Sequence, residues 1–404
     1  MKRLKKFLKW TAIVLLSVAS IVILVVAFLN WQASRRVEAR LAPLREAGKP
    51  VSVADLAPSP VDDSQNAAKT LEPLSDAISE YNRQLAKATR DATTDEQFEL
   101  GAVQVARMNA TERSELVAKL REASQLPTFQ PDYDYASGPM PLMESVIDQA
   151  GQNKMIARIL YAHGLMALAD GQTDEAIVDA IAILDWSKLV ADQPLLVNYL
   201  MSASLYFRAA ELAEKCLYAK NATPQVRTQL LGAFGEFDLA KQFTHAIDTE
   251  RAFGISSFES FALVRFQIMI GELSAYLDTV SAFESYAKAP AGVALETTQI
   301  EGVFAGSSWS AIANGLTVLR RLQAEKRAIQ ILAGWQDSGL GVDASIGDLE
   351  LPETVTTDPF DGSPMKLKAI GDTIAVYSVG ENLIDDGGQL GSLFDDEQDV
   401  GVAP

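Results

Sequence analysis

The sequence predicts a mostly α-helical protein with an N-terminal transmembrane helix, an irregular helical bundle, and a small C-terminal β-hairpin module packed on a long helix. Three observations predict this fold class. Residues 11–29 form one uncharged apolar run. Apolar residues then recur at three- and four-residue spacing through most of the chain. Near residue 365 the spacing changes to the alternation that is typical of strands.

The apolar run from Thr11 to Leu29 is nineteen residues long, which as a helix spans about 28 Å, close to the thickness of a bilayer core. Trp10 and Trp31 flank it, at the positions where indole rings meet the membrane interfaces. Five Lys or Arg residues and no acid precede it. Residues 1–32 are therefore predicted to be a basic cytoplasmic tail and an anchor that contacts the lipid bilayer through residues 11–29.

A cleaved signal peptide is the competing interpretation of this segment. Its apolar core would be unusually long, and the nearest small-x-small pattern, at residues 37–39, lies too far downstream. We therefore expect a retained anchor. The predicted location is the inner membrane, crossed once, with the N-terminus in the cytoplasm and the body on the periplasmic or extracytoplasmic side.

The charge of the body limits its partners. Residues 1–36 carry seven Lys or Arg and no acid, so the chain total of −18 leaves −25 on the remaining 368 residues. Such an acidic body repels phosphates, and we expect no nucleic-acid partner. Hydrophobic residues make up 48%, which is normal for a chain that folds around a core.

Residues 33–65 are predicted to be a juxtamembrane helix followed by a linker, because prolines recur at 50, 58 and 60. Residues 66–300 are predicted to be an exported helical domain. Within it, 66–126 has a helical pattern, 127–141 is a turn-rich break, and 153–217 carries the strongest helical periodicity.

The segment A-D-G-Q-T-D-E-A, residues 169–176, joins two predicted antiparallel helices. This hairpin resembles a single tetratricopeptide-type unit. A second copy about 34 residues away is missing from the sequence, and one unit alone cannot bury its apolar face as a solenoid does. An irregular helical bundle is therefore expected.

Residues 301–390 are predicted to combine a long helix, 308–335, with a β-hairpin. A two-residue turn at Gly371-Asp372 places Ile370 opposite Thr373, Lys368 opposite Ala375, and Lys366 opposite Tyr377. One face of the hairpin is then apolar and the other carries two lysines. Residues 391–404 are predicted to be an acidic tail.

Three short motifs mark this C-terminal region: D-P-F-x-G-x-P at 358–364, Y-S-V-G at 377–380 and D-D-G-G at 385–388. Together they resemble the C-terminal part of the major pseudopilin of type II secretion systems. The combination with a helical region resembles uncharacterised membrane-anchored bacterial proteins of planctomycete type. The resemblance implies an architecture. Residues 11–29 lack the glycine and the acid that pseudopilins carry there, so assembly into a fibre is not implied.

The pseudopilin resemblance also implies calcium in the loop after the hairpin. Asp385 and Asp386 stand there before two glycines, and hard cations prefer carboxylate and carbonyl oxygens on flexible loops. Ca²⁺ is accordingly the one cofactor that the sequence suggests. The alternative is a solvated acidic segment without a metal.

Candidate catalytic residues are few. His245, Asp248 and Glu250 lie within H-A-I-D-T-E, and His245 and Asp248 share a helix face on which a metal ion can bind. His163 lies on an apolar stripe and is expected in the core. The sole cysteine, Cys216, is expected to be buried and inert. The motifs of serine hydrolases, P-loop proteins and dinucleotide-binding folds are absent.

Two functions follow from these observations. The first is a non-catalytic scaffold or protein-interaction module of the cell envelope. The second is an envelope hydrolase that uses paired carboxylates or a metal site centred on His245.

Overall fold

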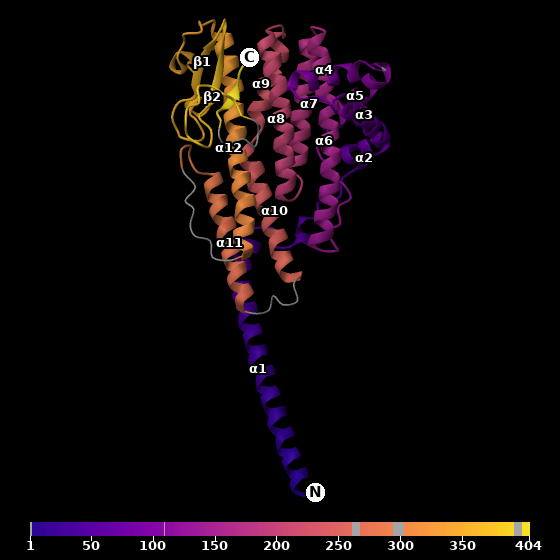
Figure 1. The fold of residues 1–404 in the computed structure, drawn as a ribbon, viewed down its shortest axis with the longest axis vertical. Coiled ribbons are helices and arrows are strands. Elements are labelled where there is room, and N and C mark those ends of the chain that lie inside the picture. The colour runs from indigo at the N-terminus through magenta and orange to yellow at the C-terminus, as the bar shows by residue number, and fades with distance from the viewer. Residues whose placement is uncertain (1, 109, 261–266, 294–302, 392–397) are drawn as a thin grey trace.

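The computed structural model describes residues 2–108, 110–260, 267–293, 303–391 and 398–404. Its helices stand side by side as an elongated body above one long N-terminal helix (Figure 1). The helices are α1 (Lys2–Glu46), α2 (Ala67–Leu71), α3 (Ser75–Ala88), α4 (Asp95–Arg107), α5 (Ala110–Ser124), α6 (Pro139–Ala169), α7 (Thr173–Ala191), α8 (Leu196–Ala219), α9 (Pro224–Glu236), α10 (Leu239–Ser260), α11 (Gln267–Ala287), α12 (Val303–Ser338) and α13 (Glu353–Thr356). The prediction of a mostly helical chain is confirmed.

Helix α1 is long and apolar enough to cross a membrane, and its apolar window lies wholly outside the protein core. The helix continues without a break into the body, where Leu41 is only 2% exposed. Val37 and Leu44 pack partly against the same core. The apolar segment and the expected juxtamembrane helix thus form one continuous helix, whose C-terminal part packs in the bundle.

The centre of the bundle is formed by α6, α7 and α8, which pack against one another. Trp186, Tyr199 and Tyr206 are among its largest fully buried side chains. The turn between α6 and α7 is made at Gly171, whose φ of 73° lies in the left-handed region that glycine adopts without strain. The predicted helical hairpin at residues 169–176 is therefore present.

Three segments differ from the sequence-based expectation. The helical region 66–126 is divided into four short α-helices. The predicted break at 127–141 ends early, because Pro139 begins α6 at a position where its missing N–H costs nothing. The predicted linker is packed: Val51 and Val53 are buried, and the Val53 N–H donates to Ser256 Oγ at 2.9 Å.

The C-terminal sheet has three antiparallel strands in the order β1 (Lys366–Ile370), β2 (Thr373–Ser378) and β3 (Val400–Val402). The predicted hairpin register is confirmed at every pair from Lys366–Tyr377 to Ile370–Thr373. Strand β3 lies in the segment expected to be an acidic tail, and α12 packs against both β2 and β3. Three residues are too few to show a strand periodicity, which is why the sequence did not indicate β3.

The buried Asp358 joins two of the C-terminal motifs. One carboxylate oxygen accepts hydrogen bonds from Phe360 N and Ser378 Oγ, both at 2.8 Å. The other accepts from Val379 N at 2.9 Å. The D-P-F and Y-S-V-G motifs therefore meet in space, and Asp358 fastens the turn before β1 to the end of β2.

Candidate functional site: the anchor-proximal cleft

A cleft of about 800 Å³ opens where α1 enters the body. Its walls come from four segments: the chain after α1, the loop before α6, the turn between α7 and α8, and one face of α10. The lining is Arg45, Gly48, Lys49, Pro50, Val51, Ser52, Asp55, Leu56, Pro58, Pro127, Thr128, Phe129, Gln130, Tyr135, Leu189, Asp192, Gln193, Pro194, His245, Asp248 and Thr249. The prolines come from loops, and prolines stiffen loops by fixing φ.

The loop wall of the cleft is held from behind. The Asn66 side chain donates to Gln130 O at 3.0 Å and accepts from Gln130 N at 2.9 Å. One side chain thus satisfies both backbone polar groups of Gln130. Phe129 packs edge-on against the buried Trp186, with ring centroids 4.8 Å apart. Gln193 donates to Phe129 O at 2.5 Å. These contacts preform the cleft and lower the entropic cost of binding there.

The start of α8, beside the cleft, contains a strained residue. Leu195 has a φ of 76°, which a Leu adopts at a cost on the order of 1–3 kcal/mol. Its buried side chain packs with Tyr133 and Leu142, and its N–H donates to Thr249 Oγ1 at 2.9 Å. The surrounding core therefore imposes this conformation on the rim of the cleft.

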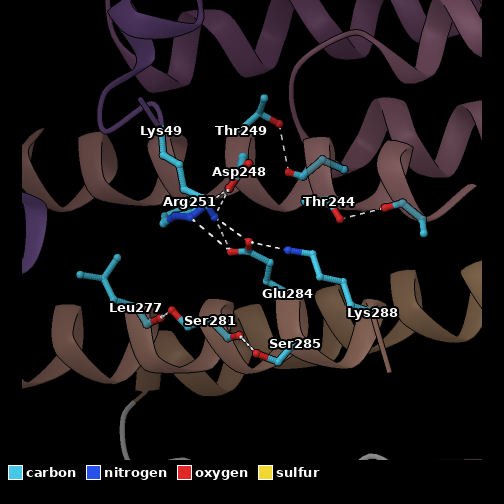
Figure 2. Close-up of polar contacts among 12 residues, drawn as sticks. Lys49, Thr244, Asp248, Thr249, Arg251, Leu277, Ser281, Glu284, Ser285 and Lys288 are labelled. Carbon is cyan, nitrogen blue, oxygen red and sulfur yellow. Dashed lines mark hydrogen bonds and ion pairs between the residues drawn. The ribbon is translucent and has the colours of Figure 1, made fainter. Parts of the chain in front are cut away.

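Beside the cleft, charged side chains from α10, from the C-terminal end of α11 and from the segment after α1 form one network, which we name the anchor cluster: Lys49, Asp248, Arg251, Glu284 and Lys288 (Figure 2). Lys49 Nζ lies 2.6 Å from both carboxylate oxygens of Glu284 and 3.4 Å from Asp248 Oδ1. Arg251 also binds Asp248, and its Nη1 lies 3.8 Å from Glu284 Oε2. The cluster thus ties the end of α1 to two helices of the body.

Electrostatics favour the charged form of Glu284 in the anchor cluster. Burial alone would raise the pKa of this carboxyl, but hydrogen bonds from Lys49 and Lys288 outweigh burial and hold the pKa below its ordinary value. The side chain of Arg251 is 2% exposed, and burial lowers its pKa. A second link, Arg40 to Asp278 at 2.8 Å, joins α1 to α11 on the surface.

The three residues predicted to act together, His245, Asp248 and Glu250, contact different partners in the structure. His245 Nε2 lies at the cleft, 3.0 Å from Asp192 O. Asp248 is paired with Arg251 and Lys49. Glu250 Oε2 accepts from Leu196 N at 3.1 Å, and burial raises its pKa. Within the described part of the chain, no three His, Cys, Asp or Glu side chains are grouped to hold a metal ion.

The other two singled-out residues behave as expected. His163 Nδ1 lies 2.6 Å from Asp179 Oδ2, and Arg121 Nε donates to the other oxygen of this buried carboxylate at 2.8 Å. Cys216 is buried, and burial raises the pKa of its thiol to about 12. Neither residue reaches the cleft.

Asp385 and Asp386 hold their own loop in place. Asp385 Oδ1 accepts from Tyr377 Oη at 3.1 Å and from Gly387 N at 3.0 Å. Asp386 Oδ2 accepts from Asn382 Nδ2 at 3.2 Å. These bonds fold the loop over β2, and calcium binding by the two acids stays a prediction.

The cleft and the anchor cluster were not predictable from sequence patterns. Lys49 and Glu284 are separated by 235 positions, and neither belongs to a recognisable motif. The only local signal was the shared helix face of His245 and Asp248, which proved to border the cleft.

Comparison of the chain with protein-family models, with curated proteins and with solved structures finds no match.

Proposed function

We propose that this chain is a single-pass, membrane-tethered scaffold that presents the anchor-proximal cleft to a protein partner at the outer face of the inner membrane. The body is exported and the basic N-terminus is cytoplasmic. We also propose that the C-terminal module has an architecture similar to that of major pseudopilins.

The observation that carries the proposal is the rigid joint between anchor and body. A tether that only retains a protein at a membrane works equally well as a flexible linker. Here the same helix that contains the apolar segment buries Leu41 in the core, and the chain that follows it places Lys49 in the anchor cluster. Such a joint fixes the height and the orientation of the cleft, which matters for a protein that positions a partner.

The nature of the cleft supports a protein partner. Its lining includes loop segments, the aromatic side chains of Phe129 and Tyr135, and charged side chains of both signs. The volume of about 800 Å³ lies in the range that takes several side chains of a peptide segment. Preformed walls reduce the ordering cost that otherwise weakens the binding of peptides.

The alternative function, an envelope hydrolase centred on His245 or on paired carboxylates, has weaker support. A metal or an activated water at His245 needs a nearby free carboxylate, and the carboxylate of Asp248 is committed to Arg251 and Lys49. Because Asp248→Ala would break the anchor cluster, His245→Ala is the clean test of the His245-centred form of this alternative.

A photo-crosslinking amino acid at Pro58, which is exposed and lines the cleft, tests the scaffold in living cells. We expect one discrete adduct from Pro58 and none of the same size from Leu100, an exposed residue of α4. Inserting four Gly or Ser residues after Gln32 should abolish the adduct without releasing the protein from the membrane, because the cleft loses its fixed orientation.

The His245→Ala variant should keep the adduct. Identical adduct patterns from Pro58 and Leu100 would contradict the proposal. A hydrolytic activity of the full chain that is lost in His245→Ala would favour the enzyme instead.

A further inference from the structure

A second concave site lies away from the cleft, between α4, α6 and α8. This pocket of about 170 Å³ has an apolar floor that includes Leu85, Phe98, Ala102, Ala157 and Leu205. Three cations stand around the floor, Lys154 and Arg158 one turn apart on α6 and Arg208 on α8. We name it the cationic pocket.

Two of these cations lack an acidic partner. Arg208 stacks over the Tyr161 ring, 4.5 Å from its centroid, and donates to Glu211 Oε2 at 2.6 Å. Lys154 and Arg158 make no ion pair or side-chain hydrogen bond within the described part of the chain.

Lys154 and Arg158 are repelled by neighbouring cations, whereas Glu211 and Tyr161 stabilise the charge of Arg208 and raise its pKa. Lys154 is exposed at its surface side, but partial desolvation beside the pocket lowers its pKa, and repulsion from Arg158 and Arg208 lowers it further. Burial and repulsion from Arg208 lower the pKa of Arg158 in the same way. An anion beside Lys154 and Arg158 would reduce the repulsion that these two cations experience, so this side of the pocket favours a negative ligand.

The small volume of the cationic pocket and its apolar floor limit which anions can bind there. Sites for drug-sized ligands occupy roughly 300–1,000 Å³, so this pocket takes a smaller group. Guanidinium groups match the planar geometry of a carboxylate, and the apolar floor suits one aliphatic side chain next to it. Inorganic phosphate has no apolar part to cover the floor.

The position of the pocket in the body favours a peptide ligand over a lipid headgroup. Helices α4 and α8 lie in the half of the body remote from the N-terminal end of α1 (Figure 1). When α1 is embedded, lipid headgroups lie beside the two ends of residues 11–29 and therefore do not reach the pocket. We propose that the cationic pocket binds the free C-terminal carboxylate of a polypeptide whose last side chain is aliphatic. This site goes beyond the proposed scaffold function, because it is separate from the cleft and specifies the chemistry of a partner's end.

Fluorescence anisotropy with the full-length protein in phosphatidylcholine nanodiscs tests this inference. The probe is a short labelled peptide that ends in leucine with a free carboxylate, compared with the same peptide as a terminal amide. We expect the free acid to bind at least about tenfold more tightly than the amide, which corresponds to about 1.4 kcal/mol.

The double variant Lys154→Gln with Arg158→Gln should reduce the affinity for the acid to that for the amide. Its matched control is Arg83→Gln with Lys119→Gln, which changes the net charge equally at exposed ion pairs of α3 and α5. The control should bind as the unmodified protein does. Because Lys154 and Arg158 are exposed and repel each other, the double variant should keep its melting temperature.

Three results would overturn the inference: equal binding of acid and amide, no binding of the acid at millimolar protein, or an equal loss in the control. Inorganic phosphate that binds the pocket while the peptide does not would also overturn it, since the site would then be a simple anion site.

Discussion

The two ends of the body are fastened in contrasting ways. At the N-terminal end, half-buried charges of the anchor cluster hold α1 against α10 and α11. At the C-terminal end, apolar side chains of β2 and β3 are buried against α12, and hydrogen bonds from neighbouring helices add to this packing. Tyr218 Oη donates to Ile374 O at 2.9 Å, and Ala403 N donates to Glu214 Oε1 at 2.7 Å.

This difference gives the two joints opposite responses to pH. The pKa of Glu284 is lowered, so its contribution to stability is present above the ordinary value of 4.5 and is lost as the pH falls through its folded pKa. Burial raises the pKa of Glu214 to about 7, so the folded state loses stability as the pH rises from about 4.5 to about 7. The buried Glu325 nearby shifts in the same direction, first through burial and then through repulsion by Glu214.

Arg251→Met should have the largest effect, because it removes the buried centre of the anchor cluster. Asp248 and Glu284 would then face each other with Lys49 as their main counter-charge. We expect a loss of about 3 kcal/mol in the free energy of unfolding, measured by chemical denaturation. Arg107→Met, at the exposed pair with Asp170, is the control and should cost less than about 1 kcal/mol. An equal loss in the two variants would show that the anchor cluster stabilises the fold no more than an exposed ion pair does.

Glu214→Gln tests the C-terminal joint. The amide oxygen can still accept from Ala403 N, but the side chain no longer ionises. At pH 8 we expect the variant to be more stable than the unmodified chain by on the order of 2 kcal/mol, and at about pH 4, below the ordinary pKa of 4.5, we expect no difference. Thermal melts at the two pH values measure this. A gain of the same size at both would mean that ionisation of Glu214 is not the cause.

Arg40→Gln should have the smallest effect. The side chains of Arg40 and Asp278 are 47% and 62% exposed, and such surface pairs contribute less than about 1 kcal/mol. The small loss should disappear in 1 M salt, where screening removes the attraction between exposed charges. A loss of several kcal/mol that salt leaves unchanged would mean that Arg40 acts through packing.

How far the sequence predicts this molecule depends on the range of the interactions. The hairpin register was predictable because a two-residue turn at Gly371-Asp372 determines it locally. The α6–α7 hairpin was predictable for the same reason, through Gly171. The anchor cluster joins Lys49 to Glu284 across 235 positions, and periodicity contains no information on such pairs.

The candidate site shows the same limit. The shared face of His245 and Asp248 is real, because both residues border the cleft. Their expected joint role is prevented by Arg251, one turn further along α10, and by Lys49 from the segment after α1, because both engage Asp248. Local spacing thus located the cleft wall but not the chemistry at it.

The rigid joint between anchor and body is the central claim, and the distance between spin labels on α1 and α10 tests it most directly. Labels are placed at Arg36→Cys and Lys241→Cys, both exposed positions, in a Cys216→Ala background in nanodiscs. Double electron–electron resonance should give one narrow distance distribution, which broadens when Arg251→Met is added. A broad distribution in the chain with an intact anchor cluster would contradict the claim.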